Sequence, residues 1–142
     1  MPRPVGGTGK EEALALKITL TSIIVDDQEK ALAFYTDVLG FVGKTDLPAG
    51  DFRWLTVVSP LAPDGTQLVL EPNANAAART FQEALHAQGI PLTAFEVDDI
   101  QAEVARLKAR GVRFHTEPTE AGDAVIAIFD DTCGNLIQIY QV

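Results

Sequence analysis

The chain has 142 residues, of which 46% are hydrophobic, and its 20 acidic against 11 basic side chains give a formal net charge of −9. This length and apolar content suit one compact domain. The negative charge argues against a nucleic-acid partner, because it would repel a phosphate backbone. A single cysteine, Cys133, excludes an intramolecular disulfide and a cysteine-based zinc cluster.

The N-terminal region carries no targeting or membrane signal. No stretch approaches the roughly 18 consecutive apolar residues of a membrane span, and residues 1–7 lack the apolar run of a signal peptide. We therefore expect a soluble, unsecreted, cytoplasmic protein with no membrane partner. Residues 1–17 combine prolines and glycines without regular apolar spacing, which predicts a mobile N-terminal tail.

Regular structure is expected from residue 18. The run 18–25, rich in β-branched residues, predicts a strand. Asp27 is placed to cap a helix and Gly40 to end it. Three strand candidates follow, and Pro72 closes the last of them; they cover residues 41–45, 53–58 and 67–71, before a connecting helix predicted over 76–88.

The same order of elements then begins again. Residues 92–97 predict a strand and 100–110 a helix, followed by strands over 112–117, 124–129 and 136–142. Val25-Asp26-Asp27 matches Val97-Asp98-Asp99 at an offset of 72 residues, since 97 − 25 = 72. This repeat predicts a single domain over 18–142 with one module at about 18–72 and a second at about 91–142.

Two motifs resemble those of a known family. Residues 25–35 (Val-Asp-Asp-Gln-Glu-Lys-Ala-Leu-Ala-Phe-Tyr), followed by Val-Leu-Gly-Phe at 38–41, resemble the opening helix of vicinal-oxygen-chelate proteins, the glyoxalase/bleomycin resistance protein/dioxygenase superfamily. Residues 129–138 (Phe-Asp-Asp-Thr-Cys-Gly-Asn-Leu-Ile-Gln) resemble their closing Asp-Pro-Asp-Gly-Asn-Leu-Ile-Glu turn and strand. The resemblance covers about 17–141. It implies an α+β fold in which two βαβββ modules in tandem form a cupped mixed sheet.

The resemblance also bears on metal binding. Metal-dependent members place four side chains in the cup, one from the first and one from the last strand of each module. Carried over to this sequence, the last-strand positions are Glu71 and Gln138, whose oxygens can coordinate a cation. The first-strand positions are Leu20 and Leu92, which offer no lone pair. We therefore predict no firmly held cofactor, and a divalent metal ion on Glu71 and Gln138 stays an alternative.

Other side chains could complete such a metal site. A slip of strand register by one residue would turn threonines inward, and His115 could donate from its own strand. The threonines in question are Thr19, Thr21 and Thr93.

Strand alternation predicts a mostly apolar cup with a few polar points, which suits a small, partly aromatic or amphipathic organic ligand. The candidate ligand-binding residues are Ser22, Trp54, Glu96, Gln138 and Tyr140. The leading hypothesis is a protein that binds this ligand without a firmly held metal, either as a resistance-type binding protein or as a glyoxalase-like member. Homodimers commonly close the cup in this family, so we expect a homodimer. The alternative is a glyoxalase-like lyase or isomerase, or a dioxygenase-like enzyme, with Glu71 as the catalytic general base. Two further alternatives stay open: Glu71 could be a structural carboxylate, and the cup could be filled by its own side chains.

Overall fold

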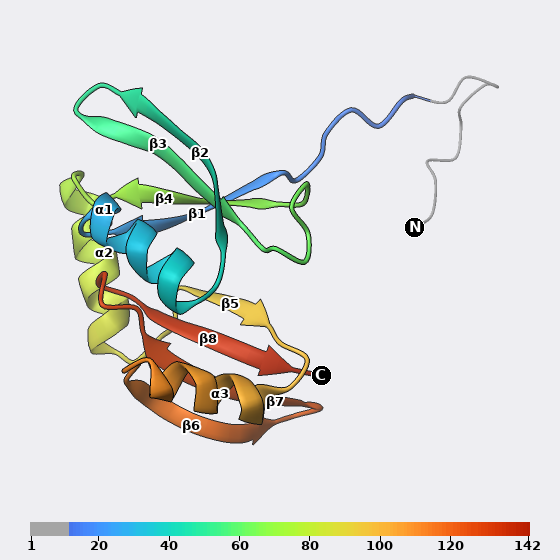
Figure 1. Cartoon of the computed structure of the whole chain (residues 1–142). Helices are drawn as coiled ribbons and strands as arrows, with labels where there is room; N and C mark the ends of the chain where they lie inside the picture. Colours follow the sequence, from blue (N-terminus) through green and yellow to red (C-terminus); the bar gives the residue numbers. More distant parts are fainter. Residues whose placement is uncertain (1–11) are drawn as a thin grey trace.

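Two strand–helix–three-strand modules follow each other along the chain (Figure 1). The computed structural model describes residues 12–142. The first module consists of β1 (Leu20–Val25), α1 (Gln28–Ala33), a π-helical turn η1 (Phe34–Val38), β2 (Val42–Ala49), β3 (Phe52–Val58) and β4 (Gln67–Pro72). After the connecting helix α2 (Ala76–Ala87), the second consists of β5 (Thr93–Glu96), α3 (Ile100–Ala109), β6 (Phe114–Ala121), β7 (Ala124–Asp130) and β8 (Leu136–Gln141).

Each module forms its own four-stranded mixed sheet. The strand orders are β1-β4-β3-β2 and β5-β8-β7-β6, so the two sheets repeat one topology. In each, the first strand lies parallel to the last strand of its module, and the remaining neighbours are antiparallel. The predicted α+β class and tandem βαβββ architecture are confirmed. The sheets remain separate within the chain, so one chain does not join them into a continuous cup.

The N-terminal segment lies apart from both sheets. Residues 1–11 of the predicted tail are outside the described part of the chain. Residues 12–17 form no helix or strand and are exposed, and they extend away from the two modules (Figure 1). Over residues 12–142, no helix is long and apolar enough to cross a membrane.

The helix starts agree with the sequence. Asp27 and Asp99 are the N-caps of α1 and α3, and their Oδ1 atoms accept hydrogen bonds from the backbone N–H groups of Lys30 (3.0 Å) and Ala102 (3.1 Å). Each carboxylate thereby satisfies one of the N–H groups that a helix start leaves unpaired. Gly40, at φ 91°, follows the first helical segment in a left-handed conformation that glycine adopts without strain.

The edge strands run longer than predicted. β2 extends to Ala49 and β6 to Ala121, whereas the sequence predicted strands ending at 45 and 117. Each extension includes a proline, Pro48 in β2 and Pro118 in β6, a residue type that is common in turns. Both strands lie at sheet edges, where proline is tolerated since its missing N–H needs no ladder partner. The pairing of both strands is also irregular, with register shifts between Gly43 and Thr45 in β2 and between Phe114 and Thr119 in β6.

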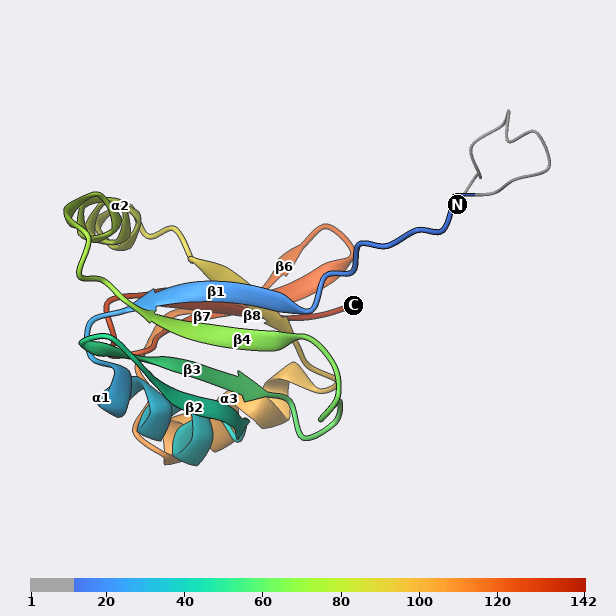
Figure 2. The ribbon, with the colours of Figure 1, turned by 90° about the horizontal axis from the view of Figure 1, so that it is seen from above.

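The two hydrophobic cores meet between the modules. Phe34, Leu39 and Phe95 pack against both clusters of buried residues. Arg106 of α3 reaches across and donates to the carbonyl oxygens of Val38 (3.0 Å) and Leu39 (3.2 Å). The helix-covered faces of both sheets are therefore turned toward a shared interior, with α1 and α3 on the same side of the molecule (Figure 1, Figure 2). The opposite faces of the sheets are left on the outside.

A buried carboxylate organises the turn between β7 and β8. Asp131 Oδ1 accepts hydrogen bonds from the backbone N–H groups of Cys133 (2.8 Å) and Asn135 (3.0 Å). Its Oδ2 accepts from the hydroxyl of Tyr35 (2.6 Å) and from Asn135 Nδ2 (2.9 Å). Burial raises the pKa of Asp131 above its usual value, and burial next to this carboxylate raises the pKa of Tyr35 well above its own. The turn is thus fixed to η1 of the other module.

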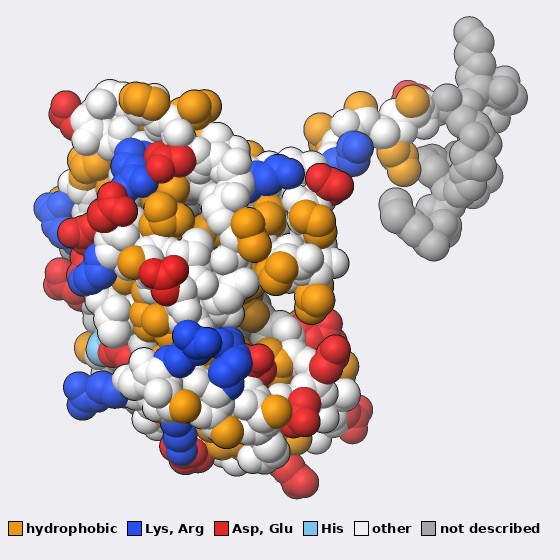
Figure 3. Space-filling model, in the orientation of Figure 1, with side chains coloured by type: hydrophobic (Ala, Val, Ile, Leu, Met, Phe, Trp, Pro, Cys, Tyr) orange, Lys and Arg blue, Asp and Glu red, His pale blue; other side chains and the backbone are white. Residues whose placement is uncertain are grey.

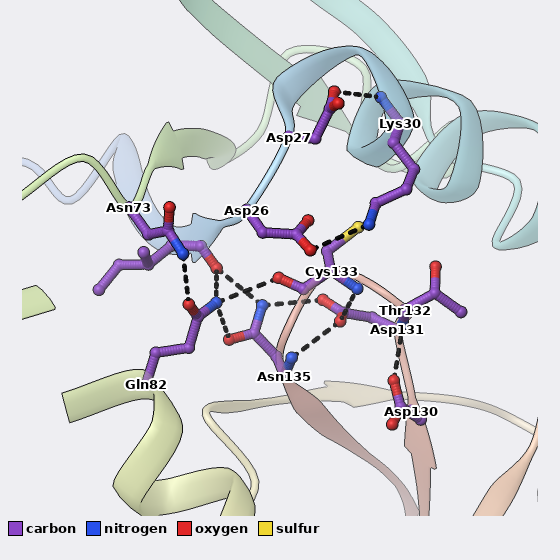
Figure 4. A network of polar contacts seen from close by, with 11 residues as sticks. Asp26, Asp27, Lys30, Asn73, Gln82, Asp130, Asp131, Thr132, Cys133 and Asn135 are labelled. Atoms are coloured by element: carbon purple, nitrogen blue, oxygen red, sulfur yellow. Dashed lines mark hydrogen bonds and ion pairs between the residues drawn. The ribbon is translucent and has the colours of Figure 1, made fainter. Parts of the chain in front are cut away.

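Gln82 of α2 joins the same turn to β1 (Figure 4). Its Nε2 lies 2.9 Å from the carbonyl oxygen of Ile24, 3.1 Å from that of Cys133 and 3.0 Å from Asn135 Oδ1. Its Oε1 accepts from Asn73 Nδ2 at 2.9 Å. Gln82 is only 4% exposed, so this buried amide is well satisfied and locks the connecting helix onto both modules.

Cys133 is a buried turn residue, and burial raises the pKa of its thiol to about 12. The folded chain therefore keeps the thiol proton at pH values where the unfolded chain loses it. Between about pH 9 and pH 12, Cys133 should thus lower stability by up to about 1.4 kcal/mol per pH unit. Urea unfolding of wild type and Cys133→Ala from pH 8 to pH 11 tests this. We expect the stability advantage of the wild type to shrink as pH rises, and a pH-independent difference would contradict it.

Candidate ligand-binding faces

The first sheet has one helix-covered face and one open face. On β1, Ile23 and Val25 belong to the core, so alternation turns Leu20, Ser22 and Ile24 to the other side. The same alternation applies to β3 and β4, where Leu55, Val57, Leu68 and Leu70 belong to the core. We call this side of the sheet the first open face; it is formed by Leu20, Ser22, Ile24, Leu47, Phe52, Trp54, Thr56, Val58, Gln67, Val69 and Glu71, of which Thr56, Val58 and Val69 are buried.

The first open face exposes large apolar side chains to solvent. Leu47 is 57% exposed, Phe52 45%, Leu20 44% and Trp54 39%. Isolated exposed apolar residues are ordinary on protein surfaces, but several on one sheet face mark a binding surface. Ser22 and Glu71 on the same face are also exposed and supply polar points within this apolar surround.

Gln28 of α1 bridges β3 and β4 at the end of the sheet that carries Trp54 and Glu71. The ladder between β3 and β4 is short: it pairs Thr56 with Val69 and Val57 with Leu68. Beyond it, Gln28 Nε2 donates to the carbonyl oxygens of Arg53 (2.7 Å) and Leu70 (2.9 Å), and Gln28 Oε1 accepts from the backbone N–H of Arg53 (3.0 Å). The buried amide thus replaces missing strand-to-strand bonds. Nothing in the sequence indicated this role.

The second sheet repeats the arrangement. Ile137 and Ile139 of β8 belong to the core, so Leu136, Gln138 and Tyr140 point to the open side. The parallel register places Ala94 beside Gln138 and Glu96 beside Tyr140. Glu96 is exposed, whereas Gln138 and Tyr140 are half-buried. We call this surface the second open face; it is formed by Ala94, Glu96, Ile126, Ile128, Leu136, Gln138 and Tyr140.

The predicted site residues therefore fall into two groups. Ser22, Trp54 and Glu71 share the first open face, and Glu96, Gln138 and Tyr140 share the second. No strand of one sheet is hydrogen-bonded to a strand of the other within residues 12–142. One chain consequently presents two half-sites on its outer surface.

Strand register shows that Glu71 and Gln138 do not occupy equivalent positions in the two modules. β1 and β5 correspond at an offset of 72 residues, because both lead into an aspartate helix cap, so Ser22 corresponds to Ala94. Ser22 pairs with Val69, whereas Ala94 pairs with Gln138. The counterpart of Gln138 is therefore Val69. A shift by two residues keeps a side chain on the same face, which is why alternation alone did not reveal the mismatch.

Glu71 consequently lies two residues farther along β4 than Val69, the counterpart of Gln138. It pairs with Ile24, and the equivalent pair in the second module is Glu96 with Tyr140, so Glu71 corresponds to Tyr140. If the ligand positions of metal-dependent relatives are carried over by this register, Leu20 and Val69 are apolar, and of the four positions only Gln138 offers an oxygen. Leu92, at the fourth, precedes β5 and packs half-buried against the first core cluster, not in a cup.

Neither strand threonine proposed as a substitute ligand points to an open face. Thr21 and Thr93 alternate with the open-face residues of their strands, and Thr19 precedes β1. His115 is exposed on edge strand β6, where its Nδ1 lies 3.1 Å from Thr116 Oγ1. Within residues 12–142, no group of three or more His, Cys, Asp and Glu side chains is placed to hold a metal ion.

Comparison with known proteins identifies the superfamily that has this fold. Residues 17–139 match the glyoxalase/bleomycin resistance protein/dioxygenase superfamily. The chain belongs to this superfamily. The resemblance inferred from the two motifs is thereby confirmed, although a superfamily that joins enzymes and resistance proteins does not specify a reaction.

Three relatives illustrate where the chain lies within the superfamily. YurT of Bacillus subtilis (strain 168), an uncharacterized protein, is 57% identical over 126 residues, which cover 89% of this chain and 99% of YurT. The crystal structure of UcmS2 superposes with a TM-score of 0.77 at 29% identity, covering 89% of this chain and 98% of UcmS2. TnmS3, an antibiotic binding protein from Streptomyces sp. CB03234, superposes with a TM-score of 0.69 at 30% identity, covering 92% and 98%.

Proposed function

We propose that this protein binds a small, partly aromatic organic molecule without a metal ion held by its side chains. The site would lie between the first open face of one copy and the second open face of its partner in a homodimer. The observation that carries the proposal is the replacement of metal-binding positions by apolar side chains, Leu20 and Val69, on a face that also exposes Trp54. The similarity to TnmS3, an antibiotic binding protein, supports the same reading.

The dimer follows from the position of the half-sites. Both open faces look outward from one chain, so a second copy is needed to bring one of each kind together. Among residues 12–142, β1 and β5 are edge strands next to these faces, and apart from the Ile24 carbonyl, which Gln82 and Asn135 occupy, their outer edges suit pairing with each other across a two-fold axis. Such a dimer would contain two equivalent sites, each built from both copies.

The chemistry of the faces defines the ligand class. Trp54 and Phe52 offer aromatic surface for stacking against a planar group, which burial of apolar area would stabilise. Gln138, Tyr140 and Ser22 would supply hydrogen bonds that fix orientation. A planar aromatic antibiotic with a few hydroxyl or amide groups fits this set.

Trp54 makes the proposal directly testable, because it is the single tryptophan of the chain and lies on the first open face. Titration with metal-free bleomycin and with a panel of planar quinone antibiotics, followed by Trp54 fluorescence, should reveal a saturable change for at least one compound. Excess EDTA should leave that titration unaltered. Binding that requires added nickel, zinc, manganese or iron would contradict the metal-free site.

Glu71 supports a second candidate, a lyase or isomerase. Its carboxylate is exposed on the first open face and accepts no hydrogen bond from another residue of the range 12–142. It is therefore available to accept a proton from a ligand. NMR spectra of each bound compound over time separate the two functions. Chemical conversion that is lost in Glu71→Gln would support the enzyme, whereas an unchanged compound supports binding alone.

A further inference from the structure

A cleft lies between the modules, and Glu96 is the one lining residue that it shares with the open faces. This cleft has a volume of about 500 Å³, within the range of small-molecule sites. Its walls come from the segment after η1, from the β3–β4 loop and from the β5–α3 connection with α3. Figure 3 shows the hollow between hydrophobic side chains of the upper module and acidic side chains of the lower one.

The interior of the cleft is aromatic and apolar. Phe41 and Phe95 contribute one ring from each module, with centroids 5.1 Å apart and planes at 75°, an edge-to-face arrangement. Leu39 and Leu107 extend the same surface. Edge-to-face rings leave part of a ring face available to a third group, and the negative face of an aromatic ring attracts cations.

The rim of the cleft is acidic. Glu96, Asp98, Asp99 and Glu103 line it together with one cation, Arg106. The positive charge of Arg106 is already matched, because its guanidinium bonds to both carboxylate oxygens of Glu103 and to two backbone carbonyls. Asp99 is engaged as the cap of α3. Asp98 and Glu96 are both exposed, and neither forms an ion pair with another residue of the described range 12–142.

We propose that this inter-module cleft is a binding site for a small organic cation. The apolar or aromatic body of the ligand lies against Phe41 and Phe95, and its ammonium or amidinium group lies at the rim beside Asp98 and Glu96. The net charge of −9 draws cations toward the molecule as a whole. Another cleft, of about 540 Å³, is lined by Arg110, Arg113 and His86 together with one carboxylate, Asp130, so its charged side chains are mostly basic.

Three analogues of one shape test the charge preference. Phenethylammonium, phenethyl alcohol and 3-phenylpropionate are titrated into ¹⁵N-labelled full-length protein, and backbone amide shifts are followed. We expect the cation to bind most tightly and to shift amides of residues 96–103. Asp98→Asn should weaken its binding about two- to fivefold, the range of an exposed ion pair. Asp123→Asn removes the same charge at the β6–β7 turn and should leave the affinity unchanged.

Filling the cleft with a larger side chain tests whether the ligand binds there, without altering a core residue. Ala102 is an exposed residue of α3 that lines the cleft, and Ala105, one turn farther along, is exposed but does not line it. Ala102→Trp should abolish binding of phenethylammonium, whereas Ala105→Trp should retain it. Equal affinity for the neutral alcohol, shifts confined to the open faces, or retained binding by Ala102→Trp would each overturn the proposal. Trp54 fluorescence tests the open faces separately.

Discussion

Replacing Asp131 by asparagine is expected to lower the free energy of unfolding by about 3 kcal/mol. Four donors converge on this carboxylate, two backbone N–H groups on Oδ1 and the Tyr35 hydroxyl with Asn135 Nδ2 on Oδ2. An asparagine keeps one acceptor oxygen and turns an amide N–H₂ toward the other two donors. Urea unfolding followed by circular dichroism measures the loss.

The raised pKa of Asp131 argues in the opposite direction, because burial disfavours its charge and a neutral side chain would remove that cost. We expect the geometry to outweigh this gain, since each donor left unsatisfied in the interior costs about 1–3 kcal/mol. Tyr35→Phe removes one donor only and should cost about 1 kcal/mol. The exposed substitution Asp123→Asn serves as the control with no effect. A stability of Asp131→Asn equal to wild type would show that the four contacts do not hold the turn.

Replacing Trp54 by alanine is expected to weaken ligand binding about thirtyfold, which corresponds to about 2 kcal/mol for a buried aromatic anchor. The same substitution should change stability by less than about 1 kcal/mol, because the side chain is 39% exposed on the open face. Isothermal titration calorimetry with the antibiotic identified by fluorescence measures the affinity.

Phe81→Ala is the matched control for this prediction. Phe81 is a large aromatic side chain that is 52% exposed, but it lies on α2 and on neither open face. Its removal should leave ligand affinity unaltered. Wild-type affinity in Trp54→Ala, or a comparable loss in Phe81→Ala, would remove the first open face from the site.

The sequence predicted the parts of this protein that depend on local pattern. Asp27 and Asp99 cap their helices as expected, and the repeat at an offset of 72 residues corresponds to two sheets of identical strand order. Alternation also assigned Ser22 and Tyr140 to open faces, because a strand turns successive side chains to opposite sides.

The features that the sequence did not reveal depend on long-range geometry. Glu71 and Gln138 carry similar local motifs, yet strand pairing places them two residues out of step. Tyr35 and Asp131 meet across 96 residues of sequence, and neither residue type signals such a partner. Separation of the half-sites likewise accompanies the packing of η1 against α3, which the apolar spacing within either helix does not reveal.

Subunit complementation tests the central claim, that each ligand site is built from the first open face of one copy and the second open face of its partner. Trp54→Ala disables the first face and Tyr140→Ala the second, so each variant alone should bind poorly. In a mixed dimer, one site carries both substitutions and the other carries neither. After equal amounts exchange subunits, about a quarter of the wild-type sites should return at wild-type affinity. Recovery of no sites, from variants shown by light scattering to be exchanging dimers, would contradict the account.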